Sequence, residues 1–130
     1  MKVKSELSSV LLDKGLAELG DCLLNFLVSA AKSRVLGRFC GERVPNKVLV
    51  LALDKSGLRY LLPKRLKPHA RSNAVEALIA YAWLMRVITI DEAIDILASR
   101  LSIDAGTFNS YVDAVAELVR VIKGRIIGEA

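Results

Sequence analysis

Two acidic residues, Asp21 and Glu76, each lie in or beside an apolar run with helical spacing. Ionised carboxylates are seldom buried unless they are paired or bind a cation. Mg²⁺ prefers oxygen ligands, keeps several of its waters, and is commonly held by one or two carboxylates together with substrate phosphate oxygens. If their helices pack face to face, these residues predict a divalent-metal site, with the carboxylates about 4–7 Å apart across the cation.

Structural roles are the alternative for both acids. Glu76 stands three residues after Asn73, which is the spacing of a capping box at a helix N-terminus. Asp21 follows Gly20, where a kink in the helix would account for a polar residue. Neither acid by itself therefore establishes a metal site.

Positive charge is concentrated in the middle of the chain. The net charge of +5 divides into −1 for residues 1–31, +9 for residues 32–71 and −3 for residues 72–130. Such a block attracts the phosphates of a nucleic acid or another anionic surface, although a solvated basic face that only aids solubility is the alternative. Aromatic residues make up 5% of the chain, too few for a single-strand stacking platform, so duplex recognition fits better.

The length and composition indicate one domain over residues 1–130, large enough to bury a core without disulfides. Hydrophobic residues make up 53% of the chain, so we expect a partner subunit to cover part of the apolar surface. Charges interrupt every apolar stretch before it reaches membrane-spanning length, and we expect a cytoplasmic protein. Cys22 and Cys40 lack the neighbours of a zinc site and are expected to be reduced thiols.

The first half of the chain reads as helical. After a short N-terminal helix, apolar residues recur at helical spacing over residues 16–36, and Gly37 is expected to end this helix. Pro45 suits the first turn of the next helix, and Gly57 is expected to close it. One further turn is expected over residues 58–62.

The second half continues the all-α pattern. Asn73 is expected to cap a helix that runs to about Met85, and Thr89 to cap the helix after it. A last helix is expected over residues 104–122, with Gly124 as its stop. The fold class predicted from these elements is all-α.

A basic connection precedes the Glu76 helix. Pro63 and Pro68 bracket it, and we expect a loop on the approach to the proposed site, where several cations would meet phosphates. His69 in the same loop is expected to have no chemical role. The residues predicted to bind RNA in this way are Lys64, Arg65, Lys67 and Arg71.

The motifs resemble those of a known family. The segment Leu16-Ala17-Glu18-Leu19-Gly20-Asp21-Cys22 resembles the signature helix of the ribonuclease III catalytic domain. The segment Val75-Glu76-Ala77-Leu78-Ile79-Ala80-Tyr81 resembles that family's second acidic motif. Between them, Val44-Pro45-Asn46-Lys47 is similar to the start of the family's next helix. The resemblance covers residues 16–97 and leaves out the last helix.

The chain departs from the family's fuller pattern at two positions. Ala17 stands where the first motif has its inner glutamate, and Asn73 stands where the second begins with aspartate. The Mini-ribonuclease III branch, which lacks an appended double-stranded RNA-binding domain, has alanine at the first position and keeps only the acids matching Asp21 and Glu76. The resemblance is therefore closest to that branch. Glu18 and Asn73 are candidates for supporting groups around the metal, a plain surface role being the alternative for Glu18.

The resemblance implies a homodimeric, ribonuclease III-like helical endonuclease domain with a metal site in each subunit. Asp21 and Glu76 would be the catalytic and metal-binding residues, and Mg²⁺ (or Mn²⁺) the cofactor. Each site would cut one strand of a double-stranded RNA and leave a 5′-phosphate. Two alternatives remain: a catalytically inactive dimer that binds structured RNA, and a small helical protein–protein interaction module, which leaves the basic block unexplained.

Overall fold

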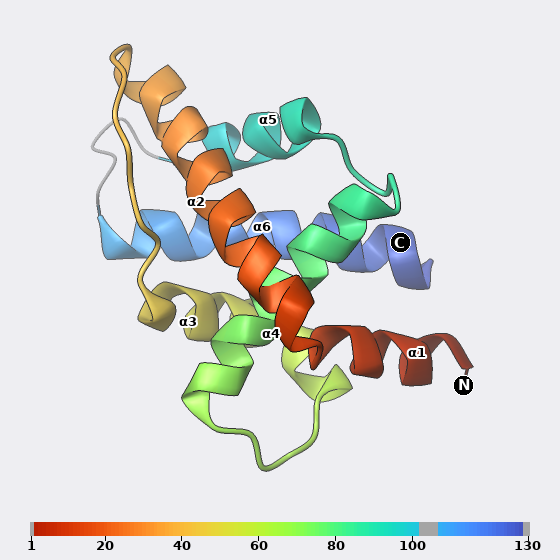
Figure 1. Cartoon of the computed structure of the whole chain (residues 1–130). Coiled ribbons are helices and arrows are strands. Elements are labelled where there is room, and N and C mark those ends of the chain that lie inside the picture. The colour runs from red at the N-terminus through yellow and green to blue at the C-terminus, as the bar shows by residue number, and fades with distance from the viewer. Residues whose placement is uncertain (1, 102–106, 129–130) are drawn as a thin grey trace.

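The computed structural model describes residues 2–101 and 107–128 of the chain, with side chains from residue 6 onward. Within these residues the chain forms helices and no strand, so the all-α prediction is confirmed (Figure 1). The elements are α1 (Lys2–Leu11), α2 (Lys14–Leu36), α3 (Asn46–Ser56), the single 3-10 turn η1 (Leu58–Leu61), α4 (Pro68–Leu84), α5 (Ile90–Arg100) and α6 (Phe108–Ile127). No helix in this part of the chain is long and apolar enough to cross a membrane.

Local signals set several helix ends where the sequence predicts them. Helix α2 ends at Gly37, whose φ of 71° is a left-handed conformation that glycine adopts without a steric penalty. Gly57 closes α3 in the same way, with φ of 80°. The Thr89 hydroxyl accepts a hydrogen bond from the backbone N–H of Glu92 at 3.1 Å and caps α5. Asp13 is the N-cap of α2, and its carboxylate accepts a hydrogen bond from the Leu16 N–H at 2.9 Å.

The predicted start of the Glu76 helix is wrong. Helix α4 begins at Pro68, because proline at the first helical position has a suitable φ and needs no N–H partner. Asn73 therefore lies inside the helix and is not its cap. Glu76 lies more than two turns into the helix, and the capping-box alternative for it is excluded. His69 and Arg71 also belong to α4, and the basic connection ends at Lys67.

The predicted end of the last helix is also wrong. Helix α6 continues through Gly124 to Ile127, and Gly128, with φ of 81°, is its C-cap. Ile126 and Ile127 pack against the core, which favours the extra turn. The expected start near Asp104 lies outside the described residues.

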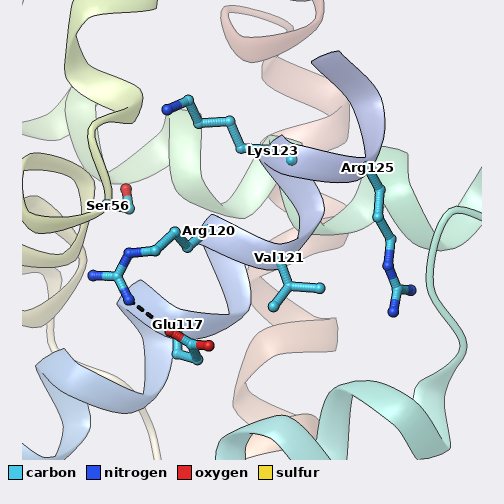
Figure 2. Close-up of a pocket in the computed structure, with 7 residues that line it drawn as sticks. Ser56, Glu117, Arg120, Val121, Lys123 and Arg125 are labelled. Carbon is cyan, nitrogen blue, oxygen red and sulfur yellow. Dashed lines mark hydrogen bonds and ion pairs between the residues drawn. The ribbon is translucent and has the colours of Figure 1, made fainter. Parts of the chain in front are cut away.

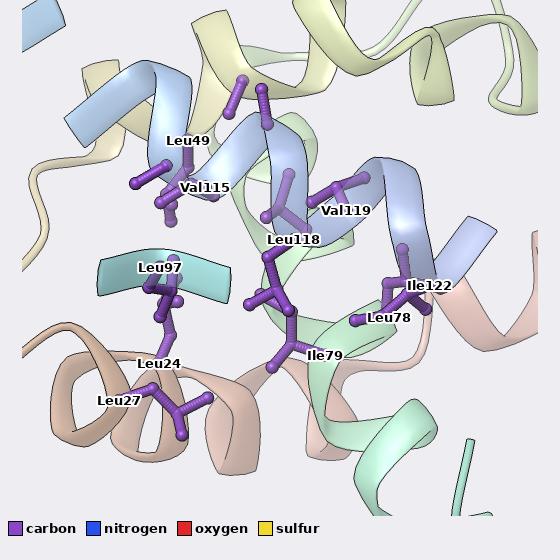
Figure 3. Close-up of a cluster of buried hydrophobic side chains, with 14 of the residues drawn as sticks. Leu24, Leu27, Leu49, Leu78, Ile79, Leu97, Val115, Leu118, Val119 and Ile122 are labelled. Atoms are coloured by element: carbon purple, nitrogen blue, oxygen red, sulfur yellow. The ribbon is translucent and has the colours of Figure 1, made fainter. Parts of the chain in front are cut away.

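Helix α4 lies at the centre of the molecule. Between Ala74 and Ala82 it exposes almost no side chain, and it packs against α1, α2, α3 and α6. Leucine, isoleucine and valine side chains of α2, α3, α5 and α6 meet it in one core (Figure 3). Because neighbouring helices pack around α4, its orientation is fixed. The residues of α4 that face α2, where the proposed site lies, are therefore fixed too.

Candidate active site

A glycine brings α2 and α4 into contact at the proposed site. A Cβ atom added at Gly20 would lie 1.9 Å from the Glu76 carbonyl oxygen and 2.4 Å from its carbonyl carbon. The two backbones thus approach closer than any larger residue would allow. The contact places Asp21, the next residue of α2, beside the Glu76 side chain of α4. Gly20 therefore serves helix packing, and the alternative of Asp21 at a glycine kink is not needed to explain its position.

Asp21 and Glu76 form a coupled carboxyl pair. Burial of the Glu76 side chain, followed by its hydrogen bond with Asp21 and the negative charge of Asp21, raises the pKa of Glu76 to about 8, against an opposing effect of Arg43. Glu76 is 6% exposed. The Glu76 carboxyl therefore keeps its proton to a higher pH than an exposed glutamic acid does. The hydrogen bond between the two side chains places them side by side, and the separation of about 4–7 Å across a bound cation stays a prediction.

Asn25 holds the Asp21 side chain in place. Its side-chain amide donates a hydrogen bond to an Asp21 carboxylate oxygen at 3.2 Å, and its carbonyl oxygen accepts one from the Val44 backbone N–H at 2.8 Å. Asn25 lies one turn after Asp21 on α2, so the two side chains lie on the same helix face. This contact links Asp21 to the connection that enters α3.

A cleft of about 280 Å³ opens in front of the pair. Glu18 and Asn73, the predicted supporting residues, line it together with Asp21 and Glu76. Ala17 also faces it, so the cleft wall is small and apolar where the family's fuller motif has a carboxylate. The remaining lining residues are not among those predicted for the site: Lys14, Arg43, Asn46 and His69.

Helical spacing contains a signal for two of the missed residues. Lys14 and Asp21 are seven residues apart on α2, and His69 and Glu76 are seven apart on α4, which places each pair on one face. The His69 Nε2 atom lies 3.3 Å from the Asn73 side-chain amide nitrogen. The expectation that His69 lies in a loop is wrong, because it belongs to α4, whereas the expectation that it has no chemical role stays a prediction. Arg43 carries no such signal, because it lies in a connection.

The predicted RNA-binding residues divide into two groups. Lys64, Arg65 and Lys67 are exposed in the connection between η1 and α4. Arg71 is half-buried on α4, and its Nε donates to the Leu66 carbonyl at 2.9 Å. None of these four lines the cleft. The exposed group borders α4 only near its first turn, where His69 lies.

The donor set fits a hard divalent cation held largely by its substrate. No group of three or more His, Cys, Asp or Glu side chains suited to a metal occurs among the described residues. Two carboxylates with polar neighbours match the minimal set for Mg²⁺, which completes its shell with waters and phosphate oxygens. A cation bound here would favour the ionised form of Glu76, since its positive charge would offset the repulsion from Asp21.

A second concave surface lies on the outer side of α6, away from this cleft (Figure 2). Its cations are engaged within the protein. Arg120 donates to Glu117 at 2.5 Å, and Arg125 pairs with Glu92. The side chains of Arg120 and Arg125 point to different sides of the helix. This surface does not converge on a ligand as the Asp21–Glu76 cleft does.

The two cysteines have no part in the site. Cys22 is exposed on α2 and Cys40 is half-buried in the following connection, and both are free thiols, as the sequence predicts.

An all-helical domain with a carboxyl pair at a helix crossing and cations on the cleft rim has the features of a nuclease. The family profile described as Ribonuclease III matches residues 14–128, and the chain therefore belongs to the ribonuclease III family. The match extends through α6, so the expected limit of the resemblance at residue 97 is wrong. Helix α6 packs against α3, α4 and α5 and is part of the family fold. Comparison with curated proteins gave no significant match.

Proposed function

We propose that the protein is a Mg²⁺-dependent (or Mn²⁺-dependent) endoribonuclease that cleaves double-stranded RNA during RNA processing in the cytoplasm. The observation that carries the proposal is the Asp21–Glu76 pair, held across the Gly20 contact in a cleft that also contains cationic side chains. Family membership supports a ribonuclease role. The match to the Mini-ribonuclease III pattern, with alanine at position 17, belongs to the same proposal.

The reaction is hydrolysis of a phosphodiester. A water oxygen forms a bond to phosphorus, the bond from phosphorus to the 3′-oxygen breaks, and that oxygen takes up a proton while the water loses one. The products are a 5′-phosphate and a 3′-hydroxyl. When bound, Mg²⁺ supplies Lewis-acid stabilisation of the phosphate oxygens and lowers the pKa of the attacking water. Asp21 and Glu76 supply the protein oxygen ligands, and Asn25 orients the Asp21 carboxylate.

Duplex RNA is the substrate that the surface charge favours. A-form duplexes are recognised mostly through phosphates and 2′-hydroxyls, which exposed cations can contact without reading sequence. The exposed group Lys64, Arg65 and Lys67 meets this requirement. Cleavage of both strands needs two sites, so a homodimer with one strand cut per subunit is part of the proposal.

A catalytically inactive, dimeric RNA-binding protein is the second candidate. Ala17 and Asn73 favour it, because they leave the cleft with fewer carboxylates than the family's fuller motif has. Cleavage distinguishes the two candidates, and salt-sensitive duplex binding distinguishes both from a protein–protein interaction module.

Incubation of the purified protein with a long RNA duplex, with Mg²⁺ or with EDTA, tests the proposal. We expect Mg²⁺-dependent shortening of the duplex and 5′-phosphate ends. The Asp21→Asn and Glu76→Gln variants should bind the duplex without cutting it, while Glu6→Gln, on exposed α1 surface, should cut normally. Binding without cleavage by the unaltered protein over a range of Mg²⁺ and Mn²⁺ concentrations would favour the inactive RNA-binding protein.

A further inference from the structure

A ladder of polar side chains on α2 holds the connection that returns toward the cleft. Asn25, Ser29 and Ser33 are four residues apart, and therefore share one face of the helix. Their side-chain oxygens accept the backbone N–H groups of Val44 at 2.8 Å, Glu42 at 2.8 Å and Cys40 at 3.0 Å. Figure 1 shows the connection running back along α2 to the start of α3. Each turn of the helix thus binds every second residue of the connection.

The ladder determines where Arg43 points. Cys40, Glu42 and Val44 are half-buried, whereas Gly41 and Arg43 between them are exposed. The Glu42 carboxylate is fixed by Lys32 and by the Tyr111 hydroxyl, which donates to it at 3.0 Å. With both neighbours anchored, Arg43 lies on the opposite side of the connection and lines the cleft.

The Arg43 guanidinium is available to a ligand. It forms no hydrogen bond or ion pair with any residue in the described part of the chain, unlike Lys32, Arg34 and Lys55, which pair with acids. A guanidinium presents parallel N–H donors that match two phosphate oxygens. Arg43 is therefore a cation held at the cleft by its backbone, with a charge that acts on Glu76 but no hydrogen bond or ion pair to a described residue.

The small number of carboxylates in the cleft favours a role for the Arg43 guanidinium in catalysis. In-line displacement builds negative charge on the phosphate oxygens, which some nucleases stabilise with a second metal ion. Glu18 is a third carboxylate on the cleft lining, but the described residues contain no group of three or more metal-binding side chains suited to an ion. Because Ala17 and Asn73 are not acidic, few ligands remain for a second ion. A fixed guanidinium supplies positive charge at the phosphate without further carboxylates.

We propose that Arg43 is a catalytic residue that contacts the scissile phosphate of the RNA, and that the Asn25–Ser29–Ser33 ladder positions it. The inference rests on the proposed endoribonuclease function. Asp21 and Glu76 would hold the metal, and Arg43 stabilises negative charge that develops on the non-bridging oxygens of the phosphate.

The test compares Arg43→Ala with Arg38→Ala, which removes the same charge from the same connection outside the cleft. With Mg²⁺ and saturating protein, Arg43→Ala should lower the single-turnover cleavage rate of an RNA duplex on the order of 100-fold. Arg38→Ala should cleave at the rate of the unaltered protein. Arg43→Lys should recover part of the rate, because the ammonium keeps the charge but not the paired donors.

Duplex binding in EDTA provides a second measurement that does not need the metal. Loss of one phosphate contact should reduce the slope of log affinity against log salt by about 0.7–0.9 in Arg43→Ala. Circular dichroism should show that both variants fold, since both side chains are exposed.

The outcomes separate the two proposals. If the unaltered protein cleaves the duplex and Arg43→Ala cleaves equally well, the inference about Arg43 is overturned and the endoribonuclease proposal stands. If the unaltered protein never cleaves, the endoribonuclease proposal fails, and the catalytic role of Arg43 fails with it. A reduced salt slope in Arg43→Ala would still support a contact between Arg43 and a phosphate. An unchanged salt slope in Arg43→Ala would show that Arg43 does not contact a phosphate of the duplex.

Discussion

At the scale of single residues, the site depends on an unfavourable arrangement of two acids. Glu76 is buried beside Asp21, and the pKa of Glu76 is raised to about 8 for that reason. This arrangement does not stabilise the fold, because ionising the buried Glu76 places a second negative charge beside Asp21 in a poorly solvated place. Strongly shifted carboxyl pKa values cluster at functional sites.

The pair predicts how the metal-free protein responds to pH. The ordinary pKa of Glu76 is 4.5 and the folded value is about 8, so folding favours the protonated form. The contribution of this group to the free energy of unfolding is fully present below pH 4.5 and is lost as the pH rises through about 8. Urea unfolding in EDTA at several pH values should show the loss, and Glu76→Gln should remove it. Equal pH dependence in the two proteins would show that another group is responsible.

At lower pH a different residue should dominate. The hydrogen bond from Lys32 lowers the pKa of Glu42, so its contribution is present above 4.5 and is lost as the pH falls through the folded value. The two acids therefore act in opposite directions and in separate pH ranges.

At the scale of elements, the site depends on how closely α2 and α4 approach. The Gly20→Ala variant should be destabilised by about 3 kcal/mol, because its Cβ would meet the Glu76 backbone at 1.9 Å, where neither partner is a flexible side-chain end. Gly15→Ala, in the first turns of the same helix, meets nothing closer than the Asp13 carboxylate at 3.4 Å. It should be neutral or more stable by up to about 1 kcal/mol. Thermal and urea unfolding measure both, and equal stabilities would contradict the close contact.

The connection before α4 predicts a separate effect on RNA binding. The triple variant Lys64→Ala, Arg65→Ala, Lys67→Ala should lose roughly two to three units from the slope of log affinity against log salt, and equally for unrelated duplexes. Arg71 is left intact because its hydrogen bond to Leu66 helps to fix the start of α4. Anisotropy titrations over a range of salt concentrations provide the measurement. An unchanged slope would move the RNA-binding surface away from this connection.

Much of this arrangement is predictable from the sequence. Glycine and threonine caps mark the ends of α2 and α3 and the start of α5, because their signals are local. The start of α4 is missed because Asn73 resembles a cap, whereas Pro68 sets the first turn. Asp21 and Glu76 are recognised as acids in apolar runs. The sequence does not predict Arg43 and Asn25 as residues of this cleft, because their positions depend on hydrogen bonds between α2 and a connection with no periodic pattern.

At the scale of the whole molecule, apolar surface remains exposed on one side of α2. Leu19, Cys22 and Phe26 are exposed and share one helix face, with Leu19 at 40% and Phe26 at 53% exposure. Trp83 of α4 is 38% exposed and lies beside Leu23 of α2 around a small apolar hollow. A second copy of the chain could cover this face and bury its apolar side chains. The hydrophobic composition leads us to expect such an interface.

The homodimer prediction is tested by substitution on that face. We expect the unaltered protein to sediment as a dimer at micromolar concentration, with well over about 1,200 Å² buried in total. Phe26→Asp should yield a folded monomer, because the side chain is already half exposed in the single chain while a charge in an apolar interface is costly. Phe39→Asp is the matched control: Phe39 is 99% exposed in the connection after α2, and this variant should remain a dimer. A monomer for the unaltered protein would exclude the homodimer. A dimer that persists in Phe26→Asp would place the interface elsewhere. Loss of the dimer would also separate the two sites on which cutting of both strands depends.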